Sequence, residues 1–347
     1  MKNGKIQIGF IGAGNIAQNA HIPAYLQRKD VELAAVYDIH KQRTAEAAQK
    51  YDMKCCSSME ELLSLDYLDA VSICTWNNGH AESAIAAAKA GKHILCEKPM
   101  SMTVAEAMAM EKAANESGKV FMMGFVYRFK PEPKLVNQMR LNGDFGDIYY
   151  ARTTVLRRRG TPIGWFTDHA KSGGGPVIDI GVHVIDLTWF LMGKPKPVSL
   201  MAQIHYNKFG DFKTKGVKRW EAFDTDDTIY NVEDSAAGVI NFENGKSINF
   251  DVSWAINGFA EMNAHLYGEK SGATLYPLTI FGENADYLTN NTPVLREENH
   301  FENEISHFID CIQESTQCIS PAADGVAIQK ILCGIYESGK SGEVIML

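Results

Sequence analysis

The first third of the chain alternates short apolar runs with helical segments, and no other feature limits the possible folds as strongly. The segments between the runs carry helix signals, such as the alanine-rich stretch 80–90, which closes with Gly91. Thr103 and Glu106 form a capping-box pattern at the start of another helix, which Gly118 should end. Strands that alternate with helices are joined by right-handed crossovers and pair in parallel. The apolar runs are 5–11, 31–37, 54–56, 70–75, 92–96 and 119–125.

The pattern changes after residue 126, where strands and hairpins become more frequent than helices. Asn244 and Gly245 stand between two alternating runs, which is a type I′ turn signal. We therefore predict an α/β protein with two domains. The first, 1–126, should be a doubly wound parallel sheet, and the second, 127–347, should contain a large, mostly antiparallel open sheet. The expected elements of the second domain are a linker and one helix within 129–143, a strand at 146–158, strands and hairpins within 198–282, and helices at 176–192, 302–318 and 322–338.

The second domain has few predicted helices, so one face of its sheet should need another cover. A sheet with an uncovered apolar face commonly packs against a partner. We expect a second copy of the chain to supply that cover, in a homodimer or a homotetramer.

Composition narrows the possible partners and the compartment. The 347 residues carry a formal net charge of −8, which argues against nucleic acid or an anionic membrane surface as the main partner. We expect no secretory signal, because no basic segment followed by an apolar region stands at the start of the sequence. We expect no membrane span, because no stretch approaches about 18 apolar residues. The seven cysteines show no paired pattern and lie mostly in apolar runs, which indicates free thiols in a cytoplasmic protein. No Cys/His group has the spacing of a structural zinc site, so no metal is expected.

The loop after the first apolar run has the pattern GxGxxA, in the sequence Gly12-Ala13-Gly14-Asn15-Ile16-Ala17. It follows a strand and opens a helix, which is the context that the pattern requires. Gly12 permits a tight turn and Gly14 lets the backbone approach a pyrophosphate. The amides at the helix start, around Asn15 and Ile16, can then hold the phosphate charge. This loop predicts a Rossmann domain that binds a dinucleotide.

An acidic residue is expected about 20 residues after such a loop, and Asp38 ends the second strand. Its carboxylate can accept hydrogen bonds from the adenosine ribose and would repel a 2′-phosphate, which favours NAD. Lys41 and Arg43 follow closely and can pair with a phosphate, so NADP stays possible.

The fifth apolar run ends in Glu97, Lys98 and Pro99. Ligands of doubly wound sheets bind beyond the carboxyl ends of the strands, so this end should face the cofactor. A lysine there can hydrogen-bond a substrate hydroxyl and stabilise the charge that develops on it. A cis bond before Pro99 is one way to aim Lys98. The alternative is an exposed Glu-Lys pair that merely ends the strand, which contributes little energy.

A second group of candidates lies in the predicted helix 176–192. Asp179 and His183 stand four residues apart and should share one face. A histidine with a nearby carboxylate is a natural proton acceptor, although the same spacing also occurs by chance. Gly173–Gly175 precede the helix and are expected to give it a flexible approach. The basic run Arg157–Arg159 is either a solvated strand end or a contact for an acidic substrate group.

Together these segments resemble the Gfo/Idh/MocA family of NAD(P)-dependent sugar and cyclitol oxidoreductases. The matching segments are "IGFIGAGNIA", "HAESAIAAAKAGKHILCEKPMS", "GFVYRF" and "GGGPVIDIGVHVIDL". The resemblance implies a Rossmann domain followed by an α/β domain whose open sheet is often used for dimerisation. It also implies that Lys98 is the lysine of the EKP motif, that Asp179 contacts substrate and that His183 is the acid/base. Arg128, in "YRF", corresponds to a position near the active-site cleft.

One departure from the family pattern concerns the segment after the fourth strand. Members commonly have a proline-asparagine pair there, whereas this chain reads "CTWNNGH", with Trp76 in the place of the proline. We expect this segment and the end of the fifth strand to contact the cofactor. Trp76 stacks near the nicotinamide, caps the pocket or packs within the fold. The residues expected at the cofactor here are Thr75, Trp76, Asn77, His80, Glu97 and Lys98.

The resemblance implies an NAD(P)-dependent dehydrogenase that acts on a secondary alcohol of a sugar, a sugar derivative or a cyclitol, with Lys98, Asp179 and His183 as its catalytic residues. Lys98, Arg128, Asp179 and His183 are expected to bind the substrate. Two alternatives share the fold. Some relatives are glycoside hydrolases that keep NAD bound and oxidise their substrate transiently, and some are sensors without turnover.

Overall fold

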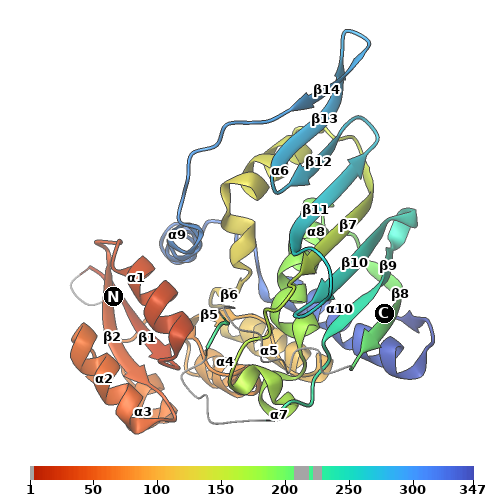
Figure 1. The fold of residues 1–347 in the computed structure, drawn as a ribbon. Helices are drawn as coiled ribbons and strands as arrows, with labels where there is room; N and C mark the ends of the chain where they lie inside the picture. The colour runs from red at the N-terminus through yellow and green to blue at the C-terminus, as the bar shows by residue number, and fades with distance from the viewer. Residues whose placement is uncertain (1–3, 207–218, 222–228) are drawn as a thin grey trace. The chain divides into compact units, whose positions relative to one another are not determined.

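The computed structural model describes residues 4–206, 219–221 and 229–347, and it divides into two units (Figure 1). The described residues of the first unit are 4–125 and 299–329. Those of the second are 126–206, 219–221, 229–298 and 330–347. The sequence placed 299–329 in the second domain, whereas the structure groups this segment with the first unit.

The first unit contains a six-stranded parallel sheet in the order β3-β2-β1-β4-β5-β6. This is the strand order of a Rossmann domain, and it confirms the predicted doubly wound sheet. Every residue of β1 is buried, as expected for the central strand of a sheet covered on both faces. The strands are β1 (Ile6–Ile11), β2 (Val31–Tyr37), β3 (Lys54–Cys55), β4 (Ala70–Ile73), β5 (His93–Glu97) and β6 (Phe121–Gly124).

The helices of the first unit begin and end largely where the sequence signals predict. Thr103 and Glu106 form the predicted capping box, and Gly118 follows the helix in the left-handed conformation. The helix after the glycine loop contains a π-helical turn, η1 (Ala17–His21), just before Pro23. Such a turn accommodates the proline, which has no amide to donate. The remaining helices are α1 (Ile22–Tyr25), α2 (Lys41–Tyr51), α3 (Met59–Leu63), η2 (Asn77–Gly79), α4 (His80–Lys89), α5 (Val104–Ser117) and α9 (His300–Gln313).

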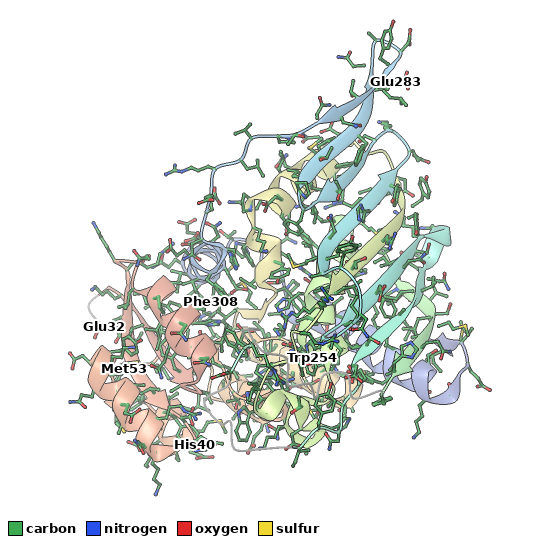
Figure 2. All side chains as sticks on the ribbon, viewed as in Figure 1. Glu32, His40, Met53, Trp254, Glu283 and Phe308 are labelled. Atoms are coloured by element: carbon green, nitrogen blue, oxygen red, sulfur yellow. The ribbon has the colours of Figure 1, made fainter. Side chains whose placement is uncertain are left out.

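Helix α9 joins the first unit although it lies far along the chain. Its buried residues Ile305, Phe308 and Ile309 form its apolar face, and Phe308 is labelled in Figure 2. An ion pair of 2.9 Å joins Arg28, just after α1, to Asp310 of α9. The segment that follows α9 reaches the sheet, where the Met123 amide donates to the Ser320 carbonyl at 2.8 Å. These contacts explain why 299–329 completes the Rossmann unit.

The second unit contains a nine-stranded sheet in the order β14-β13-β12-β11-β7-β10-β9-β8-β15. Its pairs are antiparallel except for β7 and β10, which confirms a mostly antiparallel sheet. Asn244 and Gly245 both have positive φ between β9 and β10, as the turn signal predicted. The strands are β7 (Ile148–Leu156), β8 (Pro197–His205), β9 (Ser235–Phe242), β10 (Ser247–Ser253), β11 (Glu261–Gly268), β12 (Gly272–Leu275), β13 (Leu278–Asn284), β14 (Tyr287–Asn291) and β15 (Ile345–Met346).

One apolar helix lies at the centre of the second unit. The predicted helix 176–192 divides into a π-helical part, η5 (Val177–Gly181), and α8 (Val182–Leu191), which packs on β7, β10 and β11. The run His169–Leu191 is long and apolar enough to cross a membrane by length and composition, which the sequence reading overlooked. It is mostly buried within the structure, as a helix in a protein core would be. The other helices of the unit are η3 (Val126–Phe129), α6 (Pro131–Leu141), η4 (Trp165–Thr167), α7 (His169–Ser172), η6 (Glu243–Gly245) and the end of α10 (Ala322–Ser341).

Among the residues that the structure describes, the sheet face opposite α8 carries several exposed apolar side chains. Strand alternation points Ile248 and Phe250 of β10 inward, whereas Val239 of β9 lies outward and is paired in register with Met201 of β8. Further along the same face, the rings of Tyr150 and Tyr267 stack with 5.1 Å between centroids. The outward apolar side chains Met201, Val239, Tyr267 and Phe281 are each more than a third exposed.

Candidate functional site

The glycine loop follows β1 and has the shape that a dinucleotide needs. Gly12 has a φ of +94°, and a Cβ there would lie 2.5 Å from the Cys74 carbonyl oxygen, so only glycine fits. At Gly14, apart from the residue itself and its chain neighbours, no atom of the described residues lies within 4 Å of the position a Cβ would take, so a ligand can approach the backbone. Asn15 and Ile16 begin the following helix and are partly exposed. A pyrophosphate fits this open helix start.

Asp38 lies at the end of β2 and braces the glycine loop. Its carboxylate accepts the Ala13 amide at 2.8 Å and the His40 amide at 2.9 Å. A guanidinium nitrogen of Arg43 stands 3.5 Å from the same carboxylate. An ionised carboxylate offers about four acceptor positions, so these contacts leave capacity for ribose hydroxyls. Asp38 therefore has a structural task in addition to the predicted cofactor contact.

The segment after β4 places its four candidates along the same sheet edge. Thr75 donates to the Trp76 carbonyl at 2.9 Å, and Asn77 is buried at the start of η2. The Trp76 ring meets the His40 ring edge-on, with 6.2 Å between centroids. His40, labelled in Figure 2, follows Asp38 at the end of β2. Trp76 thus lies toward the strand whose acid is expected to bind the adenosine ribose, and this position favours a cofactor contact there over one with the nicotinamide.

His80 connects this segment to the EKP motif. It is buried, with Nδ1 2.7 Å from the Pro99 carbonyl and Nε2 3.3 Å from the Thr75 carbonyl. Burial lowers the pKa of His80, so the ring is neutral and donates from one nitrogen. The shorter distance assigns this donation to Pro99. His80 therefore helps to hold the EKP segment in place through the Pro99 carbonyl.

Glu97 and Lys98 differ in exposure at the end of β5. Lys98 is partly exposed, whereas Glu97 is buried and its Oε1 lies 2.8 Å from His21 Nε2. The Lys98–Pro99 peptide bond is cis, as the sequence suggested. The Lys98 amide donates to Glu97 Oε2 at 3.2 Å. Glu97 is thus a buried support of this segment and not half of an exposed Glu-Lys pair.

The partner of Glu97, His21, belongs to the π-helical turn η1. Burial alone would lower the pKa of His21, but Cys74 and Glu97 outweigh it and raise that pKa to about 10. Burial alone would raise the pKa of Glu97. The hydrogen bond and the charge of His21 outweigh burial, and the pKa of Glu97 is lowered overall. His21 and Glu97 therefore form a buried ion pair. Ser72, 3.3 Å from His21 Nδ1, and Tyr25, 2.9 Å from Ser72, extend the polar cluster.

A buried carboxyl group lies next to this cluster. Glu304 of α9 is fully buried, and neither of its oxygens has a hydrogen-bond partner among the residues that the structure describes. Burial, with a smaller contribution from the Glu97 charge, raises the pKa of Glu304 well above its usual value. Burial therefore favours the neutral form of Glu304.

In the second unit, Asp179 is oriented by a tryptophan. The indole nitrogen of Trp254 donates to Asp179 Oδ2 at 3.0 Å. Trp254, labelled in Figure 2, is fully buried, so its position is set by packing. Asp179 lies in the π-helical turn η5 and is partly exposed, four residues before His183 of α8.

His183 is oriented by an aromatic ring. The imidazole stacks on Tyr127, with 4.5 Å between ring centroids and 20° between planes. The ammonium of Lys130 lies 4.1 Å from the centroid of the same tyrosine ring. Desolvation lowers the pKa of Lys130. Tyr127 thus lies between a cation and the candidate proton acceptor, and its ring limits how far the imidazole can rotate.

The glycines before η5 are tightly packed, so the expected flexible approach is wrong. A Cβ on Gly175 would lie 2.4 Å from the Glu233 carbonyl oxygen, and one on Gly174 would lie 2.0 Å from the Tyr336 hydroxyl. The buried Glu233 carboxylate accepts the amides of Gly175 at 2.8 Å and Val177 at 3.1 Å. Tyr336 donates to it at 2.8 Å. Glu233 caps the start of this helix and so fixes the turn that carries Asp179.

Arg128 does not take the position expected of a substrate ligand. Its side chain is buried, and both ends of its guanidinium bind the buried Asp186 of α8, with Nε donating to Oδ2 at 3.0 Å. The guanidinium also lies 4.6 Å from the centroid of the Phe190 ring. These contacts give Arg128 a task within the core of the second unit. The sequence could not distinguish a substrate-binding arginine from one that forms an ion pair in the core, because a motif position does not show which way a side chain points.

An open pocket of the second unit lies beside these candidates. Its lining includes Tyr127 and Ile180, the residue after Asp179, together with Arg157 at the end of β7. Arg157 also donates to the Gly160 carbonyl at 3.1 Å. A pocket lined by aromatic, apolar and a few charged side chains suits a small polar ligand. The other lining residues are Val155, Leu156, Ala260, Glu261 and Met262.

Comparison with known proteins identifies both units. The family description "oxidoreductase family, NAD-binding Rossmann fold" matches residues 6–125, and the description "GFO/IDH/MocA C-terminal domain" matches residues 134–274. A D-glucoside 3-dehydrogenase of Escherichia coli K12 is 33 % identical over 353 residues, which cover 100 % of this chain and 99 % of that protein.

Further similarities support the same grouping. A glucose-6-phosphate 3-dehydrogenase of Bacillus subtilis is 32 % identical over 191 residues, 53 % of each chain. The solved structure of a levoglucosan dehydrogenase in complex with NADH and levoglucosan shares the fold, with a TM-score of 0.82 and 24 % identity over 99 % of both chains.

Proposed function

The chain belongs to the Gfo/Idh/MocA family of oxidoreductases, which have an NAD-binding Rossmann domain, and from this premise we propose that it oxidises a ring hydroxyl of a D-glucoside. The observation that carries the proposal is the similarity to a D-glucoside 3-dehydrogenase along the whole chain. The sequence also contains all three expected catalytic residues, Lys98, Asp179 and His183. The hydroxyl on carbon 3 is the proposed site of oxidation.

The residues that would hold the cofactor lie at the carboxyl edge of the first sheet. The open backbone at Gly14 suits the pyrophosphate, and Asp38 suits the adenosine ribose. Bound NAD would supply the acceptor for the hydride that leaves the sugar carbon. The carboxylate of Asp38 disfavours the 2′-phosphate of NADP.

In the proposed reaction the neutral imidazole of His183 accepts the proton of the substrate hydroxyl as the carbonyl forms. The Lys98 ammonium donates a hydrogen bond to the same oxygen and stabilises its developing negative charge. Asp179, held by Trp254, accepts a hydrogen bond from a neighbouring hydroxyl and so orients the sugar ring. The buried pair His21–Glu97 and the neutral His80 keep the backbone of Lys98 in place.

The test is a substrate panel with purified protein. Methyl glucosides, free aldoses and inositols are incubated with NAD or NADP, and nicotinamide reduction is followed by absorbance. Nuclear magnetic resonance of the product then locates the new carbonyl group. The proposal expects NAD-dependent oxidation of a glucoside at carbon 3, and oxidation of inositols only would contradict it.

A phosphorylated sugar is the second candidate substrate, favoured by Arg157 in the pocket of the second unit. A guanidinium is well suited to bind a phosphate. Glucose 6-phosphate therefore belongs in the panel, together with an Arg157→Gln variant. If the phosphorylated sugar is the substrate, this variant should raise its KM at least tenfold and leave the KM of methyl glucoside unchanged.

Two further alternatives share the same residues. A glycoside hydrolase that oxidises its substrate transiently would release p-nitrophenol from a nitrophenyl glucoside without net NAD reduction. A sensor would bind NAD and show neither product.

We also infer a homodimer or homotetramer in the cytoplasm. The open sheet face around Val239 and Tyr267 supports the assembly. The seven cysteines, all of them free thiols in the structure, support a reducing compartment.

A further inference from the structure

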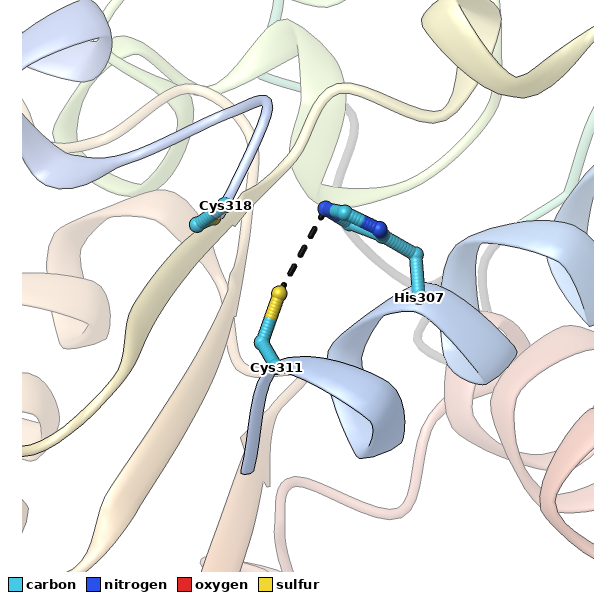
Figure 3. Close-up of side chains that lie close together, drawn as sticks. All are labelled: His307, Cys311 and Cys318. Atoms are coloured by element: carbon cyan, nitrogen blue, oxygen red, sulfur yellow. Dashed lines mark hydrogen bonds between the residues drawn. The ribbon is translucent and has the colours of Figure 1, made fainter. Parts of the chain in front are cut away.

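Three potential metal ligands meet at the end of α9, and none of them takes part in the proposed reaction. His307 and Cys311 stand four residues apart on α9, so they share one face of the helix. The helix ends at Gln313, and Cys318 lies in the segment that follows (Figure 3). His307 and Cys318 are partly exposed and Cys311 is buried, so the group can be reached from solvent.

The sequence hid this group because the predicted helix continued to residue 318. In an unbroken helix Cys311 and Cys318 would be separated by seven residues, or about 10 Å along the axis. No metal ion could bind both thiols at that separation. Because α9 ends five residues earlier, the chain reverses and brings Cys318 back beside Cys311.

The distances match three corners of a metal site. One atom each from His307, Cys311 and Cys318 lie within 4.8 Å of one another. With Zn–S bonds near 2.3 Å and Zn–N bonds near 2.0 Å, a tetrahedral site places sulfur about 3.6 Å from nitrogen and about 3.8 Å from sulfur. The distance from Cys311 Sγ to His307 Nε2 is 3.5 Å. Only small side-chain movements would therefore be needed to close the three atoms around one ion.

We propose that His307, Cys311 and Cys318 form a binding site for a thiolate-preferring divalent metal ion, with Zn²⁺ as the expected ion. Two sulfur ligands and one imidazole suit zinc and exclude magnesium and calcium, which prefer oxygen. Water completes the tetrahedral coordination.

Metal binding has an identifiable competitor within the chain. The amide of Ile319 donates to His307 Nε2 at 3.1 Å and so occupies the lone pair that would bind the ion. This hydrogen bond already draws the segment after α9 toward the helix, which pre-forms the site. Coordination by Nε2 would replace it with a stronger bond and release the Ile319 amide.

The site would fasten the last segment of the first unit to its sheet. Cys318 lies two residues before Ser320, whose hydroxyl donates to the Met123 carbonyl of β6 at 2.9 Å. Pro321 continues this contact as a bridge to Met122. A metal ion at Cys318 would thus join α9 to the chain that pairs with β6. The expected role is structural, because the ion would cross-link two segments of the first unit.

The experiment uses Co²⁺ as a spectroscopic substitute for Zn²⁺ with the full-length, untagged protein. The protein is reduced, stripped with a chelator and titrated under exclusion of oxygen, so that a disulfide between Cys311 and Cys318 cannot remove the ligands. We expect one Co²⁺ per chain, a thiolate-to-cobalt charge-transfer band and intense visible bands typical of tetrahedral cobalt. Added Zn²⁺ should bleach these bands and raise the melting temperature.

Matched variants decide between this site and binding elsewhere. Cys318→Ser and His307→Gln should each weaken Co²⁺ binding by at least about 100-fold, since loss of an indirect support alone costs 10–100-fold. Cys55→Ser removes an exposed thiol outside the group and should bind normally. Circular dichroism verifies that each variant is folded. Cys318 is replaced instead of the buried Cys311, because its replacement disturbs less packing. Native protein without cobalt–thiolate bands, or a Cys318→Ser variant with native affinity, would overturn the proposal.

Discussion

The ring of Tyr127 lies nearly parallel to the imidazole of His183, with 4.5 Å between the two centroids. The relationship explains how a partly exposed histidine can hold one orientation. Tyr127→Ala should lower kcat by about 10- to 100-fold with little change in KM, because the proton acceptor loses its fixed geometry. Tyr127→Phe keeps the stacked ring and should stay within about threefold of native kcat. Steady-state kinetics with the substrate found in the panel test both, and a Phe variant as impaired as the Ala variant would assign the effect to the hydroxyl.

Lys98 and His183 should act in a single step. Lys98→Met should lower kcat/KM by about 100-fold or more, while NAD still binds and the fold persists. His183→Ala should remove a proton acceptor worth about 10²–10⁴-fold and should abolish the loss of activity on the acid side of the pH profile. The double variant should lose less than the product of the two single losses. Fully multiplicative losses would mean that the residues act independently, and native kcat/KM in Lys98→Met would reduce the EKP segment to a strand ending.

The buried pair His21–Glu97 should make stability depend on pH in a defined direction. The pKa of His21 is raised from 6.5 to about 10, so its stabilising effect is complete below pH 6.5 and is lost as pH rises toward 10. The pKa of Glu97 is lowered, so its part is present at neutral pH and is lost on acidification. His21→Leu should reduce the free energy of unfolding by about 3–5 kcal/mol at pH 6, since it strands a buried charge.

Urea titrations at pH 6 and pH 9 measure this difference. It should be larger at pH 6 than at pH 9, and a difference that grew with pH would contradict the assignment. Glu304 also lowers the free energy of unfolding as pH rises, because burial raises its pKa in the folded protein above that in the unfolded chain. A Glu304→Gln background removes that contribution and isolates the effect of His21.

Asp38 should determine the preference for NAD, and two substitutions separate its charge from its structural task. Asp38→Asn keeps an oxygen that can accept the Ala13 amide and removes the charge, so the affinity ratio of NAD to NADP should fall about tenfold or more. Asp38→Ala also releases the glycine loop and should weaken both cofactors. Fluorescence titration gives the dissociation constants, and tighter binding of NADP by the native protein would refute the assignment.

The open sheet face should mediate self-association. Val239 lies outward beside Met201, so Val239→Arg would place a charge in the centre of the interface and should dissociate the assembly. Val294→Arg provides the matched control, because Val294 is 99 % exposed and lies outside the strands. Light scattering after gel filtration gives the mass of each variant. A native monomer at micromolar concentration, or a Val239→Arg oligomer, would exclude this face.

Local patterns predicted what depends on neighbouring residues. Strand β1 follows from its apolar run, and the capping box follows from the side chains of Thr103 and Glu106. The turn at Asn244-Gly245 follows from the ability of these two residues to adopt positive φ. The glycine loop belongs to the same class, because its shape is fixed by Gly12.

The supports of the candidate site were not predictable in this way. Glu97 pairs with a histidine 76 positions away, and Glu233 caps a helix that starts 56 residues before it. Tyr127 was within a recognised motif, yet only the fold shows that its ring stacks on His183. Such contacts depend on how distant segments meet, and one sequence carries no periodic signal for them.

The return of 299–329 to the first unit has a consequence for synthesis of the chain. When residue 125 leaves the ribosome, the surface of α1 and the edge of β6 that α9 and its following segment will cover are still bare. At about 5–20 residues per second, the segment that supplies this cover is complete about 10–40 seconds later. Throughout that interval the nascent Rossmann unit exposes the apolar surface that α9 will later cover. Chaperones would have their longest opportunity to bind this surface during the same interval.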